Sequence, residues 1–326
     1  ILNKNTFAFI AILFNSLLFS QTDTAAIDLV DFNATAVYGP GSGVSVHINP
    51  TGIFEFEDAP ASDNTFVLEM SESGGAFTNP SVISTVNGFF TTTINGIIPA
   101  GTVAGNYRLR VKATKGMLAD GSTFGDVFSV ESAVFVVNST TSEGVLFHSL
   151  ISPNSTQFDC TVEGDFDTDP MFGSLSISSS DVSGNIFTVS QINRLKIFNK
   201  VSGVTYKFRR INTTNFSIVD FAPVSGNFHQ IASDVPLGAY NYEMEAVAGG
   251  VSSIYTAVFV FHKSTTGLAN ESSEIICVRN DVEFNIDESN DGIGLNYPGS
   301  YYTFDFGDGT PIELFTHAEL LYNNAL

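Results

Sequence analysis

The chain of 326 residues has no tryptophan, only two cysteines and few charged side chains, 14 % of the total. Basic residues are scarcest, with 13 lysines and arginines against 34 aspartates and glutamates, which gives a formal net charge of -21. Without a basic patch the chain releases no counterions from phosphates, so nucleic acids and anionic membrane surfaces are excluded as partners. Cys160 and Cys277 fall in different predicted modules, so we expect two buried thiols and a fold that needs no disulfide.

Helical periodicity is also nearly absent after residue 20, whereas the alternation typical of strands is frequent. Residues 107–112 alternate apolar side chains with two arginines and a lysine, and residues 240–246 alternate apolar side chains with an asparagine and two glutamates. Such segments are typical of antiparallel strands with one face on a core and the charged face in water. Turn signals at short intervals, such as Gly249-Gly250, favour β-sandwiches over parallel α/β units.

A repeated pattern indicates the number of modules. Tyr107 and the segment 133–137 are echoed by Tyr240 and the segment 257–261, and serine and threonine residues follow each segment. A pair of strands that closes a module is thus followed by a linker twice. Each complete module is long enough to build its own core. The predicted modules are two sandwiches at residues 21–140 and 141–265 and the start of a third at residues 266–326.

Residues 1–20 differ from the rest of the chain. A short polar, basic start around Lys4 is followed by an apolar stretch at 7–19, and Ser20 is a small residue suited to cleavage before Gln21. This layout is typical of a signal peptide, and the apolar stretch is too short to span a membrane. A buried core helix is the alternative interpretation. We expect a secreted protein that starts at Gln21 after processing, and we expect this chain to be the N-terminal part of a longer one.

Near the C-terminal end, a strand-like stretch runs into a Gly-Asp-Gly sequence. This segment resembles the signature of the polycystic kidney disease (PKD) domain, a module with an immunoglobulin-like β-sandwich fold. The residues that carry the resemblance are Phe304, Asp305, Phe306, Gly307, Asp308, Gly309 and Thr310. Phe304 stands where the family has tryptophan, and the resemblance implies that residues 266–326 are a truncated PKD domain. The predicted fold class is therefore all-β, with tandem immunoglobulin-like β-sandwich modules after an N-terminal signal peptide.

The two aspartates of this motif are predicted to serve the fold rather than catalysis. Alternation sends Phe304 and Phe306 to one face, so Asp305 points away from the core. Asp308-Gly309 is a strong signal for a hairpin turn, because both residue types tolerate positive φ. A catalytic pair of carboxylates needs a cleft between its members, which a lone hairpin does not supply.

A broader resemblance covers the preceding modules. Residues 63–70, followed by residues 107–111, resemble the β-modules of large gliding-motility-associated surface proteins that bacteria export by type 9 secretion. A signal peptide that ends in Ser20-Gln21 and a downstream PKD domain are typical of the same class. The resemblance implies a location outside the cell, either secreted or on the outer surface.

The residue types that most often carry out catalysis are scattered along the sequence and form no recognisable motif. The five histidines show no metal-binding spacing, and the sequence has no nucleophile elbow and no phosphate-cradling loop, so we expect no enzyme. Calcium is the one cofactor that the sequence leaves open. Asp165, Asp167 and Asp169 are spaced like the first half of a calcium loop, but Pro170 stands where the bend needs glycine. A solvated acidic turn is the alternative, and the proline favours it.

These patterns predict the non-catalytic N-terminal part of a secreted, multi-module cell-surface protein involved in adhesion or gliding motility. Its expected partners are extracellular glycans or surfaces, or other proteins of the cell envelope. An alternative from another class stays open, in which the modules are spacers of a secreted polysaccharide hydrolase or protease with a catalytic domain beyond residue 326. A structural component of the cell envelope shares every one of these features.

Overall fold

The computed structural model of the chain describes residues 24–56, 64–138, 202–226, 235–236, 238–261, 298–299, 301–304, 309 and 312–322, and short strands at 158–159, 175–177, 186–189, 194–197 and 228–230. The predicted signal peptide, both cysteines and the acidic run of Asp165, Asp167 and Asp169 lie outside these residues, so their roles stay predictions. The predicted module boundaries near 140 and 265 lie outside them as well. In the described part, no helix has the length and apolar character to cross a bilayer.

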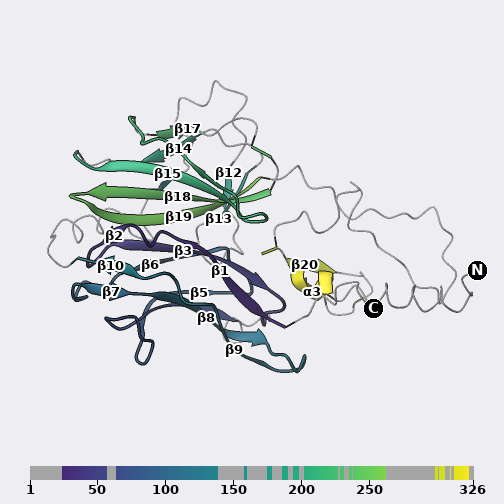
Figure 1. Cartoon of the computed structure of the whole chain (residues 1–326). Coiled ribbons are helices and arrows are strands. Elements are labelled where there is room, and N and C mark those ends of the chain that lie inside the picture. The colour runs from purple at the N-terminus through teal and green to yellow at the C-terminus, as the bar shows by residue number, and fades with distance from the viewer. Residues whose placement is uncertain are drawn as a thin grey trace, which may run out of the picture.

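The first module consists of short strands. Their bounds are β1 Ala26–Phe32, β2 Val37–Tyr38, β3 Gly43–Thr51, β4 Thr65–Met70, β5 Ser81–Asn87, β6 Thr93–Ile97, β7 Gly105–Tyr107, β8 Leu109–Met117, β9 Phe124–Phe128 and β10 Phe135–Val137. One layer is the sheet β1-β3-β6, and the other is the sheet β5-β4-β8-β9 (Figure 1). The small sheet β2-β10-β7 extends the second layer, because β7 leads directly into β8.

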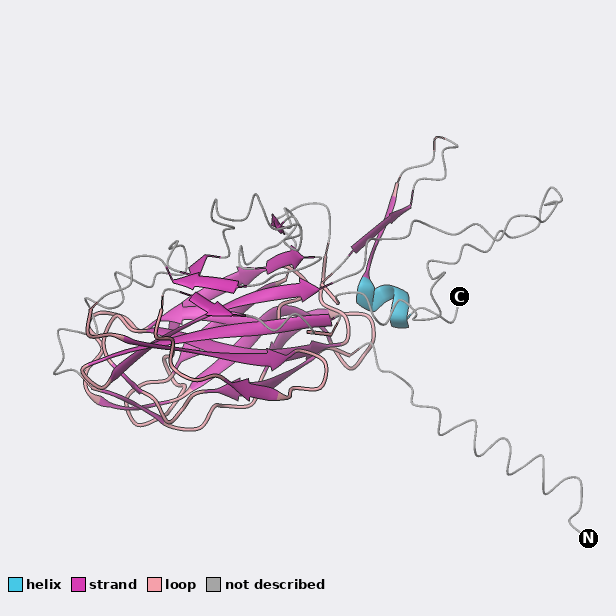
Figure 2. Cartoon of the chain, turned by 90° about the horizontal axis from the view of Figure 1, so that it is seen from above, coloured by secondary structure: helices cyan, strands magenta, loops and turns pink. Residues whose placement is uncertain are grey.

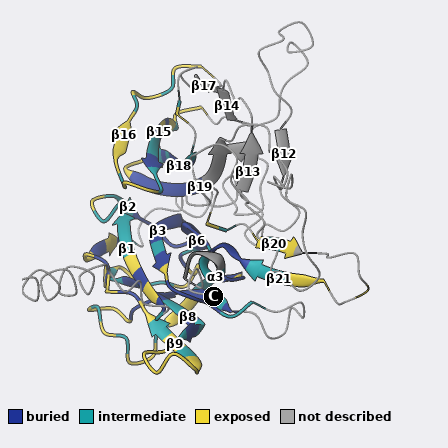
Figure 3. Ribbon diagram, turned by 90° about the vertical axis from the view of Figure 1, so that its right-hand side faces the viewer, coloured by how far each residue is buried: buried dark blue, intermediate teal, exposed yellow. Residues whose placement is uncertain are grey.

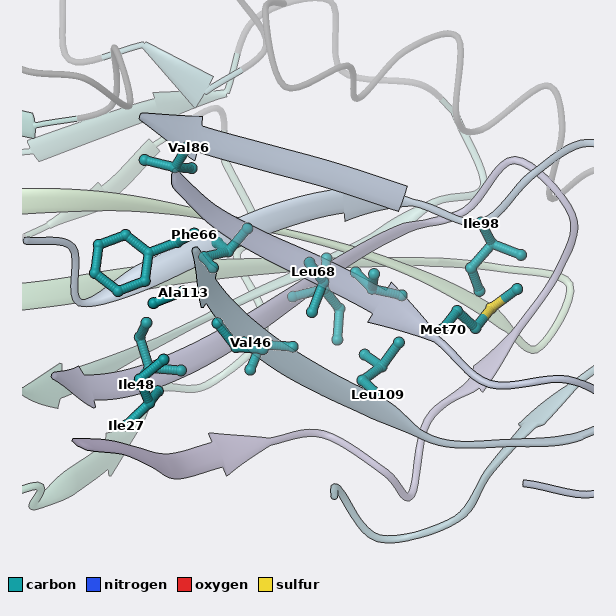
Figure 4. Close-up of a cluster of buried hydrophobic side chains, with 14 of the residues drawn as sticks. Ile27, Val46, Ile48, Phe66, Leu68, Met70, Val86, Ile98, Leu109 and Ala113 are labelled. Carbon is teal, nitrogen blue, oxygen red and sulfur yellow. The ribbon is translucent and has the colours of Figure 1, made fainter. Parts of the chain in front are cut away.

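The core of the first module lies between these two layers. Alternate residues of a strand point to opposite faces, so Val46 and Ile48 of β3 and Phe66 and Leu68 of β4 all point inward. Figure 4 shows these side chains gathered in one cluster between the strands. Burying such a cluster of aliphatic and aromatic groups is the main favourable contribution to the free energy of folding.

The predicted strand at residues 107–112 is present, with a break that the sequence does not signal. Tyr107 and Leu109 are buried and Arg110 points outward, as alternation predicts. The strand is interrupted at Arg108, whose backbone N–H donates to Ser71 Oγ at 2.9 Å and whose carbonyl accepts from the Ser71 N–H at 2.9 Å. A serine hydroxyl thus replaces one bond of the sheet ladder and separates β7 from β8.

The second module combines three long strands with several short ones. Their bounds are β11 Phe158–Asp159, β12 Leu175–Ile177, β13 Ile186–Val189, β14 Arg194–Ile197, β15 Thr205–Asn212, β16 Ile218–Asp220, β17 Phe228–Gln230, β18 Gly238–Ala248 and β19 Val251–Phe261. They form a sheet in the order β12-β13-β19-β18-β15-β16 and a smaller sheet β11-β14-β17. The predicted Gly249-Gly250 turn is confirmed: Ala248 pairs with Val251, and the two glycines have φ values of 57° and 81°.

The sequence echo corresponds to a shared topology. In the first module β10 pairs antiparallel with β7 and parallel with β2, and in the second module β19 pairs antiparallel with β18 and parallel with β13. The tyrosine of each echo lies at an equivalent place, Tyr107 opposite Phe135 and Tyr240 opposite Phe259. Each tyrosine hydroxyl donates to the carbonyl four residues upstream, that of Val103 or of Pro236. This tyrosine corner is characteristic of immunoglobulin-like sandwiches.

The two modules pack face to face. In Figure 1 and in Figure 3, the layer that contains β18 and β19 lies over the strands β3 and β2 of the first module. We call the outward side of the layer that contains the corner tyrosine the front face of a module, and the outward side of its other layer the back face. The front face of the second module therefore covers the back face of the first.

The C-terminal segment contains β20 Tyr301–Phe304, β21 Glu313–Thr316 and the helix α3 His317–Tyr322, at one end of the packed strands (Figure 2). The two strands pair antiparallel, with Phe304 opposite Glu313, and the ring of Tyr301 lies 5.7 Å from that of Phe56 in the first module. Thr316 and Glu319 cap the helix reciprocally, because the Thr316 N–H donates to Glu319 Oε2 and the Glu319 N–H donates to Thr316 Oγ1.

The packing of β4 against β3 generates a prediction about stability. Leu68 is fully buried, so Leu68→Ala should lower the free energy of unfolding by about 2–5 kcal/mol through lost burial and a cavity. Val82 lies on the neighbouring strand β5 and is 58 % exposed, so Val82→Ala should change that free energy by less than about 0.5 kcal/mol. Chemical denaturation measures both, and equal losses would contradict the placement of this core.

Candidate functional site: a buried ionic cluster between the modules

Polar side chains fill the contact between the two modules. On β3 the apolar residues point into the core of the first module, so Ser45 and His47, which alternate with them, lie on its back face. On β18 the same rule sends Tyr242 into the second module and places Asn241 and Glu243 on its front face. Because one face covers the other, these polar groups are removed from water.

Four ionisable side chains meet at the centre of this contact. His47 Nε2 lies 2.8 Å from Glu243 Oε2, and both side chains are 1 % exposed. Arg209 of β15 donates through Nε to Glu243 Oε1 at 2.5 Å and through Nη2 to Glu243 Oε2 at 2.8 Å. Asp31 of β1 places its Oδ2 2.5 Å from Arg209 Nη2. One arginine thus pairs with a carboxylate from each module.

The tautomer of His47 follows from its neighbours. Asn241 Nδ2 donates to the carbonyl oxygen of Thr92 at 3.1 Å, and Asn241 Oδ1 accepts from Thr92 Oγ1 at 2.8 Å, so the orientation of the amide is fixed. The same Nδ2 lies 2.9 Å from His47 Nδ1, which therefore has to accept. The proton of the neutral ring is on Nε2, where it is donated to Glu243.

Further hydrogen bonds cross the same contact. Asn95 Nδ2 donates to the Thr256 carbonyl at 2.8 Å, and Asn95 Oδ1 accepts from the Thr256 N–H at 2.9 Å, so one side-chain amide satisfies both backbone groups of one residue. Ser45 Oγ lies 2.6 Å from Thr256 Oγ1. Gly43 allows the closest approach, because a Cβ atom there would lie 2.9 Å from the Ile254 carbonyl oxygen.

The electrostatics favour the ionised forms of the central pair. Burial is the largest single influence on Glu243 and raises its pKa, but the hydrogen bonds from His47 and Arg209 and the charge of Arg209 outweigh it, so the pKa lies below the ordinary value. Burial lowers the pKa of Arg209, and its contacts with Glu243 and Asp31 more than reverse that effect and raise it. Burial and the nearby carboxylates also raise the pKa of Tyr38 on β2.

The donor set of the cluster fits a guanidinium better than a metal ion. Asp31, His47 and Glu243 offer ligand atoms within 4.8 Å of one another, which is close enough to surround a cation. The positive charge at this place is supplied by Arg209, which touches both carboxylates. A metal ion would have to displace that guanidinium from a buried pair, so we assign the cluster to module packing.

The same geometry leaves no room for a substrate. Both ring nitrogens of His47 are engaged, Nε2 by Glu243 and Nδ1 by Asn241, and a general base needs one of them at a reacting atom. Residues from both modules cover the cluster, and His47 and Glu243 are inaccessible to solvent. The arrangement holds two modules together and does not hold a reacting group.

The residues predicted from the PKD-like motif are described only in part. Phe304 ends strand β20, and Gly309 is exposed with a φ of 86°, in agreement with a turn between the paired strands. The rest of the motif lies outside the described residues, so its structural role stays a prediction. These residues are Asp305, Phe306, Gly307, Asp308 and Thr310. The calcium site at Asp165, Asp167 and Asp169 stays a prediction for the same reason.

One expectation about the alternating strands was wrong. The segment 240–246 alternates as predicted, but Glu243 on its polar face is buried against the first module and does not lie in water. Alternation reveals which face a side chain points to and not what covers that face. The sequence offers only a hint at the cluster, a histidine that alternates with the apolar Val46 and Ile48 of its strand and so faces away from the core of its own module.

No family model matches the sequence, and no curated protein matches it. Among solved structures, the fibronectin domains FN1–FN3 of chicken CNTN1 align at 12 % identity over 74 % of this chain and 69 % of that chain, with a TM-score of 0.21. Two fibronectin type III domains of chicken tenascin align at 12 % identity over 68 % of this chain and 93 % of that chain, with a TM-score of 0.21. The class of tandem immunoglobulin-like sandwiches rests on the strand topology and the tyrosine corners.

The buried pair predicts a large loss of stability in one variant. Glu243→Gln removes the negative charge that Arg209 and His47 contact, and breaking a buried pair costs about 3–5 kcal/mol of unfolding free energy. Glu131→Gln breaks the exposed pair with Arg108 on the outer surface and should cost less than about 1 kcal/mol. Urea denaturation of both variants tests this difference, and equal costs would contradict a buried cluster.

The depressed pKa of Glu243 predicts the direction of a pH effect. A carboxyl whose pKa is lower in the folded state stabilises that state fully above its unfolded value, ordinarily 4.5, and loses this contribution as the pH falls through the folded pKa. The difference in unfolding free energy between the wild type and Glu243→Gln should therefore be constant near neutral pH and shrink below about pH 4.5. A difference that grows on acidification would contradict the assignment.

Proposed function

We propose that this chain is the non-catalytic N-terminal part of a secreted cell-surface protein and that its two sandwich modules act as one rigid binding unit. The observation that carries the proposal is the closed contact between the modules. Interfaces between domains of one chain are ordinarily small and permit relative motion. Here the ion pair between Asp31 and Arg209, a bidentate asparagine and several hydroxyl bonds fix the register of the two faces. A fixed pair presents its exposed surfaces in one geometry.

Adhesion or gliding motility is the role that fits such a unit. The acidic, basic-poor chain excludes nucleic acid as a partner and stays soluble outside the cell. The signal-peptide layout, the PKD-like motif and the resemblance to type 9-secreted surface proteins support export to the outer surface. Extracellular glycans, surfaces or other cell-envelope proteins are the partners of this role.

The PKD-like motif also favours a second function, since PKD modules accompany secreted hydrolases and proteases as spacers. In that case a catalytic domain follows residue 326. The coding sequence downstream separates the two functions. Further sandwich modules and a sorting module favour adhesion, and a domain with a zinc motif or clustered acids favours the enzyme.

Binding without hydrolysis is the expected behaviour of the chain itself. Beads coated with residues 21–326 should be retained on cells or on insoluble polysaccharides, and beads coated with albumin should not. No reducing sugar and no peptide should be released over the same time, because the one described cluster with a histidine and two carboxylates is closed to substrates. Steady release of either product would overturn the non-catalytic assignment.

A further inference from the structure

In the described part of the chain nothing covers the front face of the first module, whereas the equivalent face of the second module is covered by the first. Arg110 follows the corner tyrosine Tyr107 at the same spacing as Glu243 follows Tyr240, so the two residues hold equivalent positions in their modules. Arg110 lies opposite Glu69 on β4, just as Glu243 lies opposite Arg209 on β15. The two modules thus carry the same cross-strand ion pair with the charges exchanged. In the second module, polar side chains of the first module contact this pair.

Arg110 is held rigidly, but its capacity to donate hydrogen bonds is not fully used. Its Nε donates to Glu69 Oε2 at 2.7 Å, and its guanidinium lies between the rings of Phe77, at 4.4 Å, and Phe128, at 4.8 Å. The terminal nitrogens make no hydrogen bond to any residue in the described part of the chain. A guanidinium fixed by two rings is preorganised to donate to an added acceptor, and a carboxylate is the acceptor that fits its planar fork.

Apolar side chains are exposed on β9, which pairs with the strand of Arg110, and on the segment that leads from β9 into β10. Phe128 is opposite Lys112 and therefore lies on the front face, and Val136 lies on the same side because its neighbour Phe135 points into the core. The exposed apolar residues of β9, of β10 and of the segment between them, here called the apolar row, are Phe124 (38 %), Phe128 (47 %), Val130 (68 %), Val134 (45 %) and Val136 (46 %). Exposed apolar side chains gathered along one segment of a soluble module mark an interaction surface.

The charges of the face are balanced and self-complementary. Arg108 pairs with Glu131 at 3.2 Å and Lys112 pairs with Asp126 at 3.2 Å, on either side of the Arg110–Glu69 pair. Each cation therefore has an acid beside it, and the three pairs together are neutral on a chain whose formal net charge is -21. The negative charge elsewhere on the chain makes two copies repel each other. When two front faces meet across a two-fold axis, however, the cations of one copy lie near the acids of the other.

We propose that the front face of the first module binds the same face of a second copy of this chain, with the terminal nitrogens of Arg110 donating to a carboxylate of the partner copy. The contact would bury the apolar row of both copies in an isologous interface. Copies on neighbouring cells or fibres would then adhere to one another. The inference rests on the proposed function only for the place where two copies meet, outside the cell. The contact itself involves no molecule other than two copies of this chain.

Sedimentation equilibrium of residues 21–326 over a range of concentrations tests this contact. The wild type should dimerise, and both Phe128→Ser and Arg110→Glu should raise the dissociation constant by about tenfold or more, since each removes a central anchor. Lys207→Glu, which changes an exposed paired cation of the second module, should dimerise like the wild type. Thermal melts identify a variant that has lost its fold, and Phe128→Ser keeps the Arg110–Glu69 pair intact for that comparison.

A wild type that stays monomeric at every concentration would overturn the proposal. A dimer that neither front-face variant weakens would overturn it as well, because another surface would then form the contact. Retention of coated beads on cells or polysaccharides is measured separately. Beads that bind while the protein stays monomeric would refute the self-contact and leave the proposed adhesion function in place.

Discussion

The pairing of Glu243 with Arg209 is the interaction on which the arrangement of the two modules depends. A buried carboxylate without a partner is strongly unfavourable, so the front face of the second module is stable against the first only while this charge is compensated. Arg209 supplies the charge, His47 supplies a hydrogen bond from the opposite module, and Asp31 balances the arginine. The surrounding hydrogen bonds of hydroxyl and side-chain amide groups fix the register of a contact that the ion pair makes possible.

The same pair with exchanged charges explains how two similar modules behave differently. In the second module the pair is covered by the back face of the first, whereas in the first module the Arg110 guanidinium, which pairs with Glu69, remains partly exposed against two phenylalanine rings. One strand–strand pair therefore appears once as an internal joint and once as an external surface. This repetition connects the packing inside the chain with the contact between copies that we propose.

Much of the fold could be predicted from the sequence, because its signals are local. Alternation identified the strands, Gly249-Gly250 identified a hairpin, and the echo around Tyr107 and Tyr240 identified equivalent strands. The cluster could not be predicted, because His47 and Glu243 are far apart in sequence and each looks like an ordinary outward residue of its own strand. Which face meets which is decided by complementarity across the whole contact, and no short pattern records it.

The central claim is that the two modules share one buried contact, and a double-mutant cycle between His47 and Glu243 tests it most directly. The unfolding free energies of the wild type, His47→Ala, Glu243→Gln and the double variant give the coupling between the two residues. Residues in contact show a coupling of about 0.5–3 kcal/mol, and the structure predicts a value in that range. A coupling indistinguishable from zero would show that the two faces do not meet.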